Sequence, residues 1–235
     1  MNGIFLTDLH LFSHRSHGQA HWEELLPSLS GCDRVILGGD IFDLRWSTVG
    51  DFDATLEAAY RWLTAAVQNH DRTHWHYLLG NHDCHPRFQA VLDRVQQEQV
   101  RFSWSPLLFE QGPDLFLHGD VIDAGCSMMA LDQFRAKFHE EKPRGKIGNL
   151  LYATLLQTRL HRTIPEFLHT PEKTSRKLLQ FLSKAQPDAL DGVENIYFGH
   201  THVPVDGYRF DRYRFYNPGS GIRHLDFSPV PFRVR

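Results

Sequence analysis

Five short apolar runs of the sequence each end in a cluster of carboxylate, amide or imidazole side chains. The clusters are Asp8-Leu9-His10, Gly39-Asp40-Ile41-Phe42-Asp43, Gly80-Asn81-His82-Asp83, His118-Gly119-Asp120 and Gly199-His200-Thr201-His202. This mixture of oxygen and nitrogen donors suits borderline divalent metals such as Mn²⁺, Fe²⁺ or Zn²⁺. The sequence therefore predicts a metal site built from segments that lie far apart along the chain.

Seven side chains in these clusters are of types that bind metals. They are Asp8, His10, Asp40, Asn81, His118, His200 and His202. Because a tetrahedral ion takes only four ligands, seven ligands favour two ions that share a bridging carboxylate. The protein has 16 histidines, and we assign a role only to those in the clusters, since a lone histidine is more often an ordinary surface or core residue.

The elements that must position these residues follow from the apolar pattern. Strand-length runs rich in β-branched and aromatic residues predict five buried strands, over Gly3–Thr7, Arg34–Leu37, Trp75–Leu79, Leu115–Leu117 and Asn195–Phe198. Helical spacing predicts helices over 51–70, with Asp51 or Asp53 as N-cap, and over 86–98. Strands that alternate with helices predict an α/β fold with a central, largely parallel sheet, whose carboxyl edge gathers the clusters. Alternating aromatic residues from about 205 predict closing antiparallel strands.

Residues 121–194 break this rhythm. They contain no convincing strand, and helical patterns cover 147–160 and 171–185. Residues 135–162 hold seven Lys or Arg and two Glu, a net charge of +5 in a chain whose net charge is −3. This insertion is either a helical hairpin with a solvated charged face or a basic, partly apolar lid over the site.

Composition narrows the function classes. With 235 residues and a net charge of −3, the chain forms one large domain or two small ones and carries no charge signature of a nucleic-acid-binding protein. Three widely spaced cysteines make no CxxC pair, and neither a secretory signal nor a membrane-length apolar run is visible. These features predict a cytoplasmic protein, with peripheral contact to the inner membrane left open.

The order of the five clusters resembles the calcineurin-like metallophosphoesterase superfamily over nearly the whole chain. The resemblance implies one domain over residues 1–235, an α/β four-layer αββα sandwich with a helical, lid-like insertion at about 121–194. It implies one metal held by Asp8, His10, Asp40 and His202, and a second held by Asp40, Asn81, His118 and His200. It also implies that His82 is the catalytic histidine near the metals and that Asp43 orients it.

This resemblance implies a hydrolase that depends on two divalent metal ions, with Mn²⁺ expected and Fe²⁺ or Zn²⁺ as alternatives. Two cations in such a site clamp the attacking and leaving oxygens of a displacement at phosphorus. A catalytically silent scaffold of the same fold would be recognised by missing ligands. All seven are present in this chain, which favours an enzyme.

Within the superfamily, the chain is most similar to the UDP-2,3-diacylglucosamine hydrolases of lipid A synthesis in length, in its Asp-Leu-His-Leu start and in its insertion. That similarity implies a lipid-linked pyrophosphate substrate, with phosphate bound by Arg135, Arg144, Arg159 and Arg162 and acyl chains by Leu150, Leu151 and Leu155.

Two features depart from that group. Its members typically have Gly-Asn-Arg-Asp where this chain has Gly-Asn-His-Asp, and Asn217-Pro218-Gly219-Ser220 resembles a turn of small soluble phosphodiesterases. A soluble phosphodiesterase or phosphatase acting on a small molecule is therefore the alternative. A near-neutral charge without a basic–aromatic stripe argues against nucleic acid as a partner, and the sequence makes no prediction of the oligomeric state.

Overall fold

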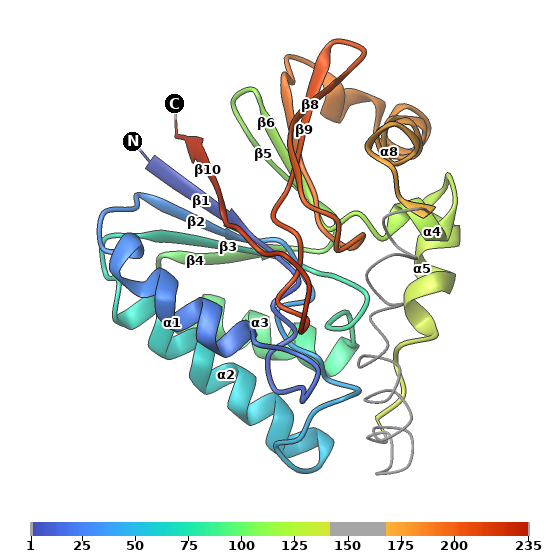
Figure 1. The fold of residues 1–235 in the computed structure, drawn as a ribbon. Coiled ribbons are helices and arrows are strands. Elements are labelled where there is room, and N and C mark those ends of the chain that lie inside the picture. The colour runs from blue at the N-terminus through green and yellow to red at the C-terminus, as the bar shows by residue number, and fades with distance from the viewer. Residues whose placement is uncertain (1, 142–167, 235) are drawn as a thin grey trace.

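The computed structural model describes residues 2–141 and 168–234, which form two five-stranded β-sheets (Figure 1). The first sheet has the order β10-β1-β2-β3-β4 and contains β1 (Asn2–Leu6), β2 (Arg34–Leu37), β3 (His74–Leu78), β4 (Phe102–Ser105) and β10 (Val230–Arg233). The second has the order β5-β6-β7-β9-β8 and contains β5 (Leu108–Gln111), β6 (Asp114–Leu117), β7 (Asn195–Tyr197), β8 (Val205–Phe210) and β9 (Tyr213–Asn217).

Each sheet has a parallel centre, with one antiparallel edge strand in the first sheet and two in the second. Strands β1 to β4 are mutually parallel, and β10 closes the edge beside β1 in the antiparallel direction. In the second sheet β6, β7 and β9 are parallel, while β5 and β8 are antiparallel to their neighbours. The carboxyl ends of the central strands of both sheets therefore carry the loops that hold the predicted site.

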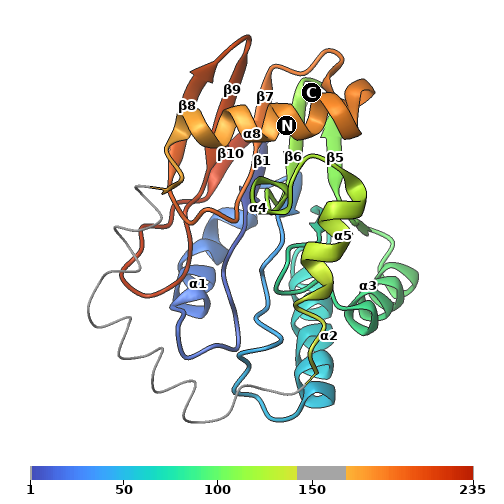
Figure 2. The same ribbon diagram turned by 90° about the vertical axis from the view of Figure 1, so that its right-hand side faces the viewer.

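Helices cover the outer faces of the two sheets (Figures 1 and 2). The described helices are α1 (Gly18–Leu29), α2 (Phe52–Gln68), α3 (Pro86–Glu98), α4 (Val121–Ala124), α5 (Met128–Ala136), α8 (Pro171–Ala185) and the 3₁₀ turn η1 (Pro187–Leu190). Side-chain caps determine where several helices begin. The Asp51 side chain accepts a hydrogen bond from the Ala54 N–H, at 2.8 Å, and so caps α2. Thr170 and Ser127 cap α8 and α5 in the same way.

Three separate apolar cores hold the layers together. The largest lies between the first sheet and α1, α2 and α3, and a second lies between the second sheet and α4 and α8. The third lies between the sheets and is mostly aromatic, with Phe5, Phe116 and Tyr197 at its centre. Successive strand residues serve different cores, as Phe5 faces the second sheet and Leu6 faces the helices. Three cores between four layers confirm the predicted αββα sandwich.

The apolar pattern by itself predicts a central, largely parallel sheet, whereas the structure has two sheets, as the family resemblance implies. All five predicted strands form within a residue of their predicted ends, and the helices over 52–68 and 86–98 also form, but the strands divide between two sheets. A buried apolar run predicts a strand without identifying its neighbours. The sequence reading also missed α1, which contains Pro27, and the four-residue strands β4 and β5, which are too short and too polar to stand out.

The described part of the insertion is helical and contains no strand. The helix predicted over 171–185 is confirmed as α8, and α4 and α5 precede it. The helix predicted over 147–160 lies outside the described residues. Among the described residues no helix is both long and apolar enough to cross a membrane.

Candidate metal centre

The seven predicted ligands follow strands of both sheets, and the structure brings six of them into overlapping clusters. Three groups of side chains each offer ligand atoms that lie within 4.8 Å of one another. The groups are Asp8, His10 and His202; His10, Asp40 and His82; and Asp40, His118 and His200. Because His10 and Asp40 each belong to two groups, the groups join into one extended cluster in the loops that follow strands of both sheets.

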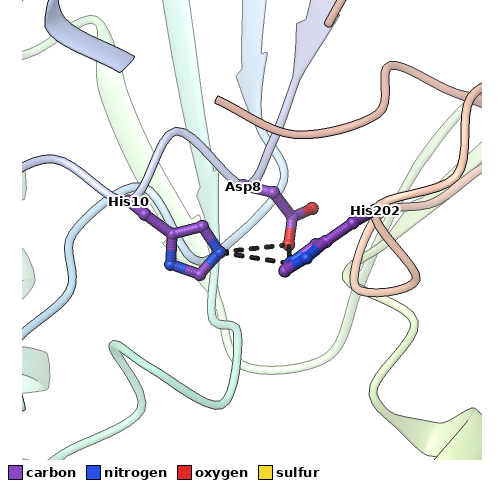
Figure 3. Close-up of side chains that lie close together, drawn as sticks. All are labelled: Asp8, His10 and His202. Carbon is purple, nitrogen blue, oxygen red and sulfur yellow. Dashed lines mark hydrogen bonds and ion pairs between the residues drawn. The ribbon is translucent and has the colours of Figure 1, made fainter. Parts of the chain in front are cut away.

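The first group shows how its donor atoms converge (Figure 3). His202 Nε2 lies 3.2 Å from His10 Nε2 and 3.2 Å from Asp8 Oδ1. His10 Nε2 lies 3.8 Å from the same carboxylate oxygen. Two imidazole nitrogens and a carboxylate oxygen that point at one another are the arrangement expected around a cation.

Asp40 and His118 form the heart of the other group. His118 Nε2 lies 3.4 Å from Asp40 Oδ2, and both side chains are almost completely buried. The Nδ1–H of His118 donates to the Gly38 carbonyl at 2.9 Å, so Nε2 is the nitrogen that faces Asp40. A buried imidazole held in this way is oriented to bind a metal through Nε2, in place of the Nε2 proton.

The backbone at the cluster is strained. Among the described residues, eight other than glycine have a positive φ, and five of these are predicted ligands: Asp8, His10, Asp40, His200 and His202. Each residue in this conformation lowers the stability of the folded protein by about 1–3 kcal/mol, and such backbone strain is concentrated at functional sites. In this conformation the side chains from the strand ends bring their ligand atoms close to one another.

The donor set fits divalent cations. Asp8 Oδ1, Asn81 Oδ1 and His118 Nε2 are buried and make no hydrogen bond of acceptable geometry within the described part of the chain. A buried acceptor without a partner costs about 1–3 kcal/mol, and a bound cation would remove that cost by accepting the lone pair. Asn81 lies in the loop after β3, next to His82 in the sequence, and its place at the second metal stays a prediction.

The electrostatics of the cluster point the same way. Burial acts to raise the pKa of the Asp40 carboxyl, but His118 and His82 hold that pKa well below its usual value. Burial acts to lower the pKa of His118, but Asp40 outweighs it and raises the pKa to about 10. Burial lowers the pKa of His10 to about 3, which keeps its imidazole neutral. The buried carboxylates thus require positive charge beside them, which a metal ion would supply.

Two glycines let the loops approach the carboxylates. A Cβ at Gly80 would overlap the Asp40 carboxylate, and a Cβ at Gly199 would overlap that of Asp8. In their place backbone amides make hydrogen bonds: His82 N–H donates to Asp40 Oδ1 at 2.7 Å, and His200 N–H donates to Asp8 Oδ2 at 2.9 Å. These bonds orient the two carboxylates toward the cluster.

Asp83 and Asn217 hold the ligand loops without belonging to the cluster. Asp83 accepts hydrogen bonds from Gly80 N–H at 2.7 Å and Ile41 N–H at 2.9 Å, and so ties the loops after β3 and β2 together. Asn217 donates to the Gly199 carbonyl at 3.0 Å and supports the loop after β7. Asp83 also accepts a hydrogen bond from the Tyr77 hydroxyl.

His82 belongs to the second donor group and is paired with Asp43. His82 Nδ1 lies 3.1 Å from Asp43 Oδ1, and the ring of His82 is 5.0 Å from that of His10. Burial acts to lower the pKa of His82, but the carboxylates of Asp43 and Asp40 outweigh it and raise the pKa above its usual value. His82 is therefore placed to hold a proton next to the cluster.

Arg15 completes this arrangement and was not found from the sequence. Its guanidinium is paired with Asp43 Oδ2 and lies 4.7 Å from the ring centre of Trp46. Burial acts to raise the pKa of the Asp43 carboxyl, but Arg15 and His82 hold it below its usual value. Arg15 lies in a loop with no motif around it, so nothing in its spacing points to Asp43. Asp123, which contacts His200, was missed for the same reason.

The structure contradicts the prediction that Arg135 binds substrate phosphate. Arg135 is buried, and its guanidinium donates to the Asp120 carboxylate at 2.6 and 3.0 Å. It also donates to the Pro106 carbonyl at 2.7 Å and the Leu79 carbonyl at 2.9 Å. These bonds tie α5 to the ends of β3 and β6, so the side chain serves the fold. Arg144, Arg159, Arg162, Leu150, Leu151 and Leu155 lie outside the described residues.

Two comparisons with known proteins were informative in different degrees. The chain matches the model of a family described as calcineurin-like phosphoesterase over residues 1–204. A comparison with curated proteins finds no match.

Proposed function

The chain belongs to the calcineurin-like phosphoesterase family, whose members are metal-dependent phosphoesterases, and on that premise we propose that its cluster binds two divalent cations and hydrolyses a phosphodiester or pyrophosphate. Asp8, His10, Asp40 and His202 would hold one cation, and Asp40, Asn81, His118 and His200 the other. The observation that carries this assignment is that Asp40 shares one donor group with His118 and His200 and another with His10, which in turn belongs to the group with Asp8 and His202. A carboxylate in that position can bridge two ions.

Bound cations would neutralise the phosphoryl oxygens and make water a nucleophile at neutral pH. The chain's own residues supply the rest. Asp40 lies 1% exposed between the two groups, and His10 and Asp8 are fully buried, so bulk water is kept from the donor atoms. Mn²⁺ is the metal we propose, because oxygen donors and imidazoles contribute in similar numbers; Fe²⁺ and Zn²⁺ are the alternatives.

His82 would act as the general acid. Its Nδ1 is engaged by Asp43, so Nε2 is the nitrogen that can hold a proton for the leaving-group oxygen. Asp43 fixes the orientation of the ring, while Arg15 fixes Asp43. Proton donation of this kind typically contributes about 10²–10⁴-fold to the rate.

The substrate we propose carries an apolar or planar substituent beside the phosphate. Two half-buried aromatic residues of the insertion lie against the cluster: the ring of Phe138 is 5.4 Å from that of His82, and the ring of Phe134 is 6.2 Å from that of His200. A UDP-2,3-diacylglucosamine-like lipid fits such a wall. A protein that acts on this lipid would be cytoplasmic and would work at the surface of the membrane. A small soluble diester is the second candidate, favoured by His82 at the third cluster and by the support that the Asn217 turn gives the β7 loop.

An assay panel tests the proposal. The protein is stripped with a chelator, reloaded with Mn²⁺, and given bis(4-nitrophenyl) phosphate, 4-nitrophenyl phosphate and UDP-2,3-diacylglucosamine. Metal-dependent hydrolysis of the diester is the expected result, and release of UMP from the lipid would identify the lipid-linked class. Two bound ions with no turnover of any compound would contradict an enzymatic role and favour a scaffold.

A further inference from the structure

Asp123 makes a contact with the cluster that the proposed function does not use. It lies on α4, at the start of the insertion, and its Oδ2 is 3.0 Å from Nε2 of His200. The two residues are separated by 77 positions in the sequence. The contact therefore joins the insertion directly to the loop after β7.

This contact determines which nitrogen of His200 can bind a metal. An ionised carboxylate only accepts hydrogen bonds, so Nε2 of His200 carries the proton and Nδ1 keeps the lone pair. His200 also offers a ligand atom to the group with Asp40 and His118, and Nδ1 is the nitrogen left for it. Metal-binding histidines usually donate their second N–H to a carboxylate or a carbonyl, which fixes the ring and its tautomer.

The neighbouring histidine is held differently. His118 donates its Nδ1–H to the Gly38 carbonyl, which is part of the first sheet's own loop. No backbone acceptor is recorded for the His200 ring within the described part of the chain, and Asp123 takes that place. The orientation of the His200 ring thus depends on a residue of the insertion, whereas that of the His118 ring depends on a loop of the sandwich.

The helix that carries Asp123 is anchored by packing. Val121 and Ile122 of α4 are almost fully buried in the same apolar core as Leu178 and Phe181 of α8. Lys177 of α8 brings its Nζ within 4.0 Å of Asp123 Oδ1. Because these groups are half-exposed, the ion pair adds little on its own, and the buried core sets the place of Asp123.

We propose that Asp123 is a positioning residue for His200, and that the insertion controls metal affinity on the His118–His200 side of the centre through it. This proposal rests on the proposed function, because it takes His200 as a metal ligand. It assigns to α4 and α8 a role in metal binding that is separate from any contact with substrate.

The test is the affinity of the full-length chain for each of two Mn²⁺ ions, measured by calorimetry on the metal-free protein. We expect Asp123→Ala to lower the affinity for one Mn²⁺ ion by about 10–100-fold. The affinity for the other ion should stay within about twofold of the wild-type value. Asp123→Asn retains an acceptor for Nε2–H and should recover most of the affinity. Lys177→Ala should have a smaller effect than Asp123→Ala.

Two controls separate this role from a merely structural one. Asp132→Ala removes an exposed aspartate of α5 in the same insertion and should change neither affinity. The thermal midpoint of the metal-free protein should be the same for Asp123→Ala and the wild type, and saturating Mn²⁺ should restore most of the turnover. Equal weakening of both ions, or a lowered midpoint without metal, would overturn the positioning role.

The outcomes also distinguish the two proposals. If the wild type binds two ions and Asp123→Ala binds both as tightly, only the role of Asp123 fails. If the wild type itself does not bind two ions, the proposed function fails first.

Discussion

The ligands that follow the first sheet and those that follow β7 are held in different ways. Asp8, Asp40 and Asn81 come from the first sheet and are at most 3% exposed, whereas the side chains of His200 and His202, in the β7 loop, are 12% and 21% exposed. The first-sheet loops are tied by backbone bonds, since Asp8 N–H donates to the Gly39 carbonyl and His10 N–H to the Asp40 carbonyl, each at 3.0 Å.

The β7 loop has one backbone bond to the neighbouring loop, from Gly199 N–H to the His118 carbonyl at 2.7 Å, and otherwise depends on side chains from distant elements. His200 N–H donates to the Asp8 carboxylate, Asn217 supports the Gly199 carbonyl, and Asp123 holds the His200 ring. The comparison indicates a rigid half of the centre that defines the bridging position and an adjustable half whose metal affinity can be tuned. Mutations in the two halves should therefore have effects of different size and kind.

The largest effect should come from the rigid half. Asp40→Ala removes the carboxylate shared by two donor groups, so both ions should be weakened together and diester hydrolysis should fall by about 10³-fold or more. Metal content by elemental analysis and turnover of bis(4-nitrophenyl) phosphate measure this. Wild-type activity in the variant would refute the site assignment.

His82→Ala should separate chemistry from metal binding. His82 belongs to one donor group but is not one of the predicted ligands, so two ions should remain while kcat falls by about 10²–10⁴-fold. His74→Ala, at the other end of β3, is the matched control and should behave as the wild type. Loss of metal from His82→Ala would mean that this histidine is a ligand.

Asp43→Asn should shift the pH dependence of the reaction. Burial acts to lower the pKa of His82, and the charge of Asp43 is the strongest of the influences that raise it. Removing the charge of Asp43 therefore lowers the pKa of His82. The protonated acid is then lost at a lower pH, and the alkaline fall of the pH–rate profile should move toward neutral pH. At neutral pH the rate should drop by about 10-fold, equivalent to a change of one pKa unit. An unmoved profile would show that His82 does not act as an acid.

The smallest effect should come from a support of the adjustable half. Asn217→Ala leaves the Gly199 carbonyl without its side-chain donor, which should lower the free energy of unfolding by about 1–3 kcal/mol. We expect a modestly weaker second ion and a nearly normal kcat when Mn²⁺ is saturating. Chemical unfolding and metal titration together check this. A loss of activity as large as that of Asp40→Ala would contradict the distinction between the halves.

Much of the rigid half could be predicted from the sequence. Strand-length apolar runs that end in Asp8, Asp40 or Asn81 place these side chains at one edge of a sheet, because parallel strands share their carboxyl edge. Residues that act through contacts between distant segments could not be found in this way. Arg15 and Asp123 have no motif around them, and only the fold brings them to Asp43 and His200.

Arg135 shows the opposite error. An arginine in a basic segment favours phosphate binding on charge alone, yet burial against Asp120 gives it a structural role. Similarly, each apolar run predicted a strand correctly, but the division of the strands into two sheets depends on contacts between residues far apart along the chain. Sequence pattern thus identified chemical groups better than it identified their partners.

The most direct test of a two-metal centre is to return Mn²⁺ stepwise to the chelated protein while measuring ions bound per chain and turnover of bis(4-nitrophenyl) phosphate in the same samples. The account predicts two ions per chain, with turnover that rises as the second one binds. Full turnover with a single ion bound, or turnover that survives complete removal of metal, would contradict it.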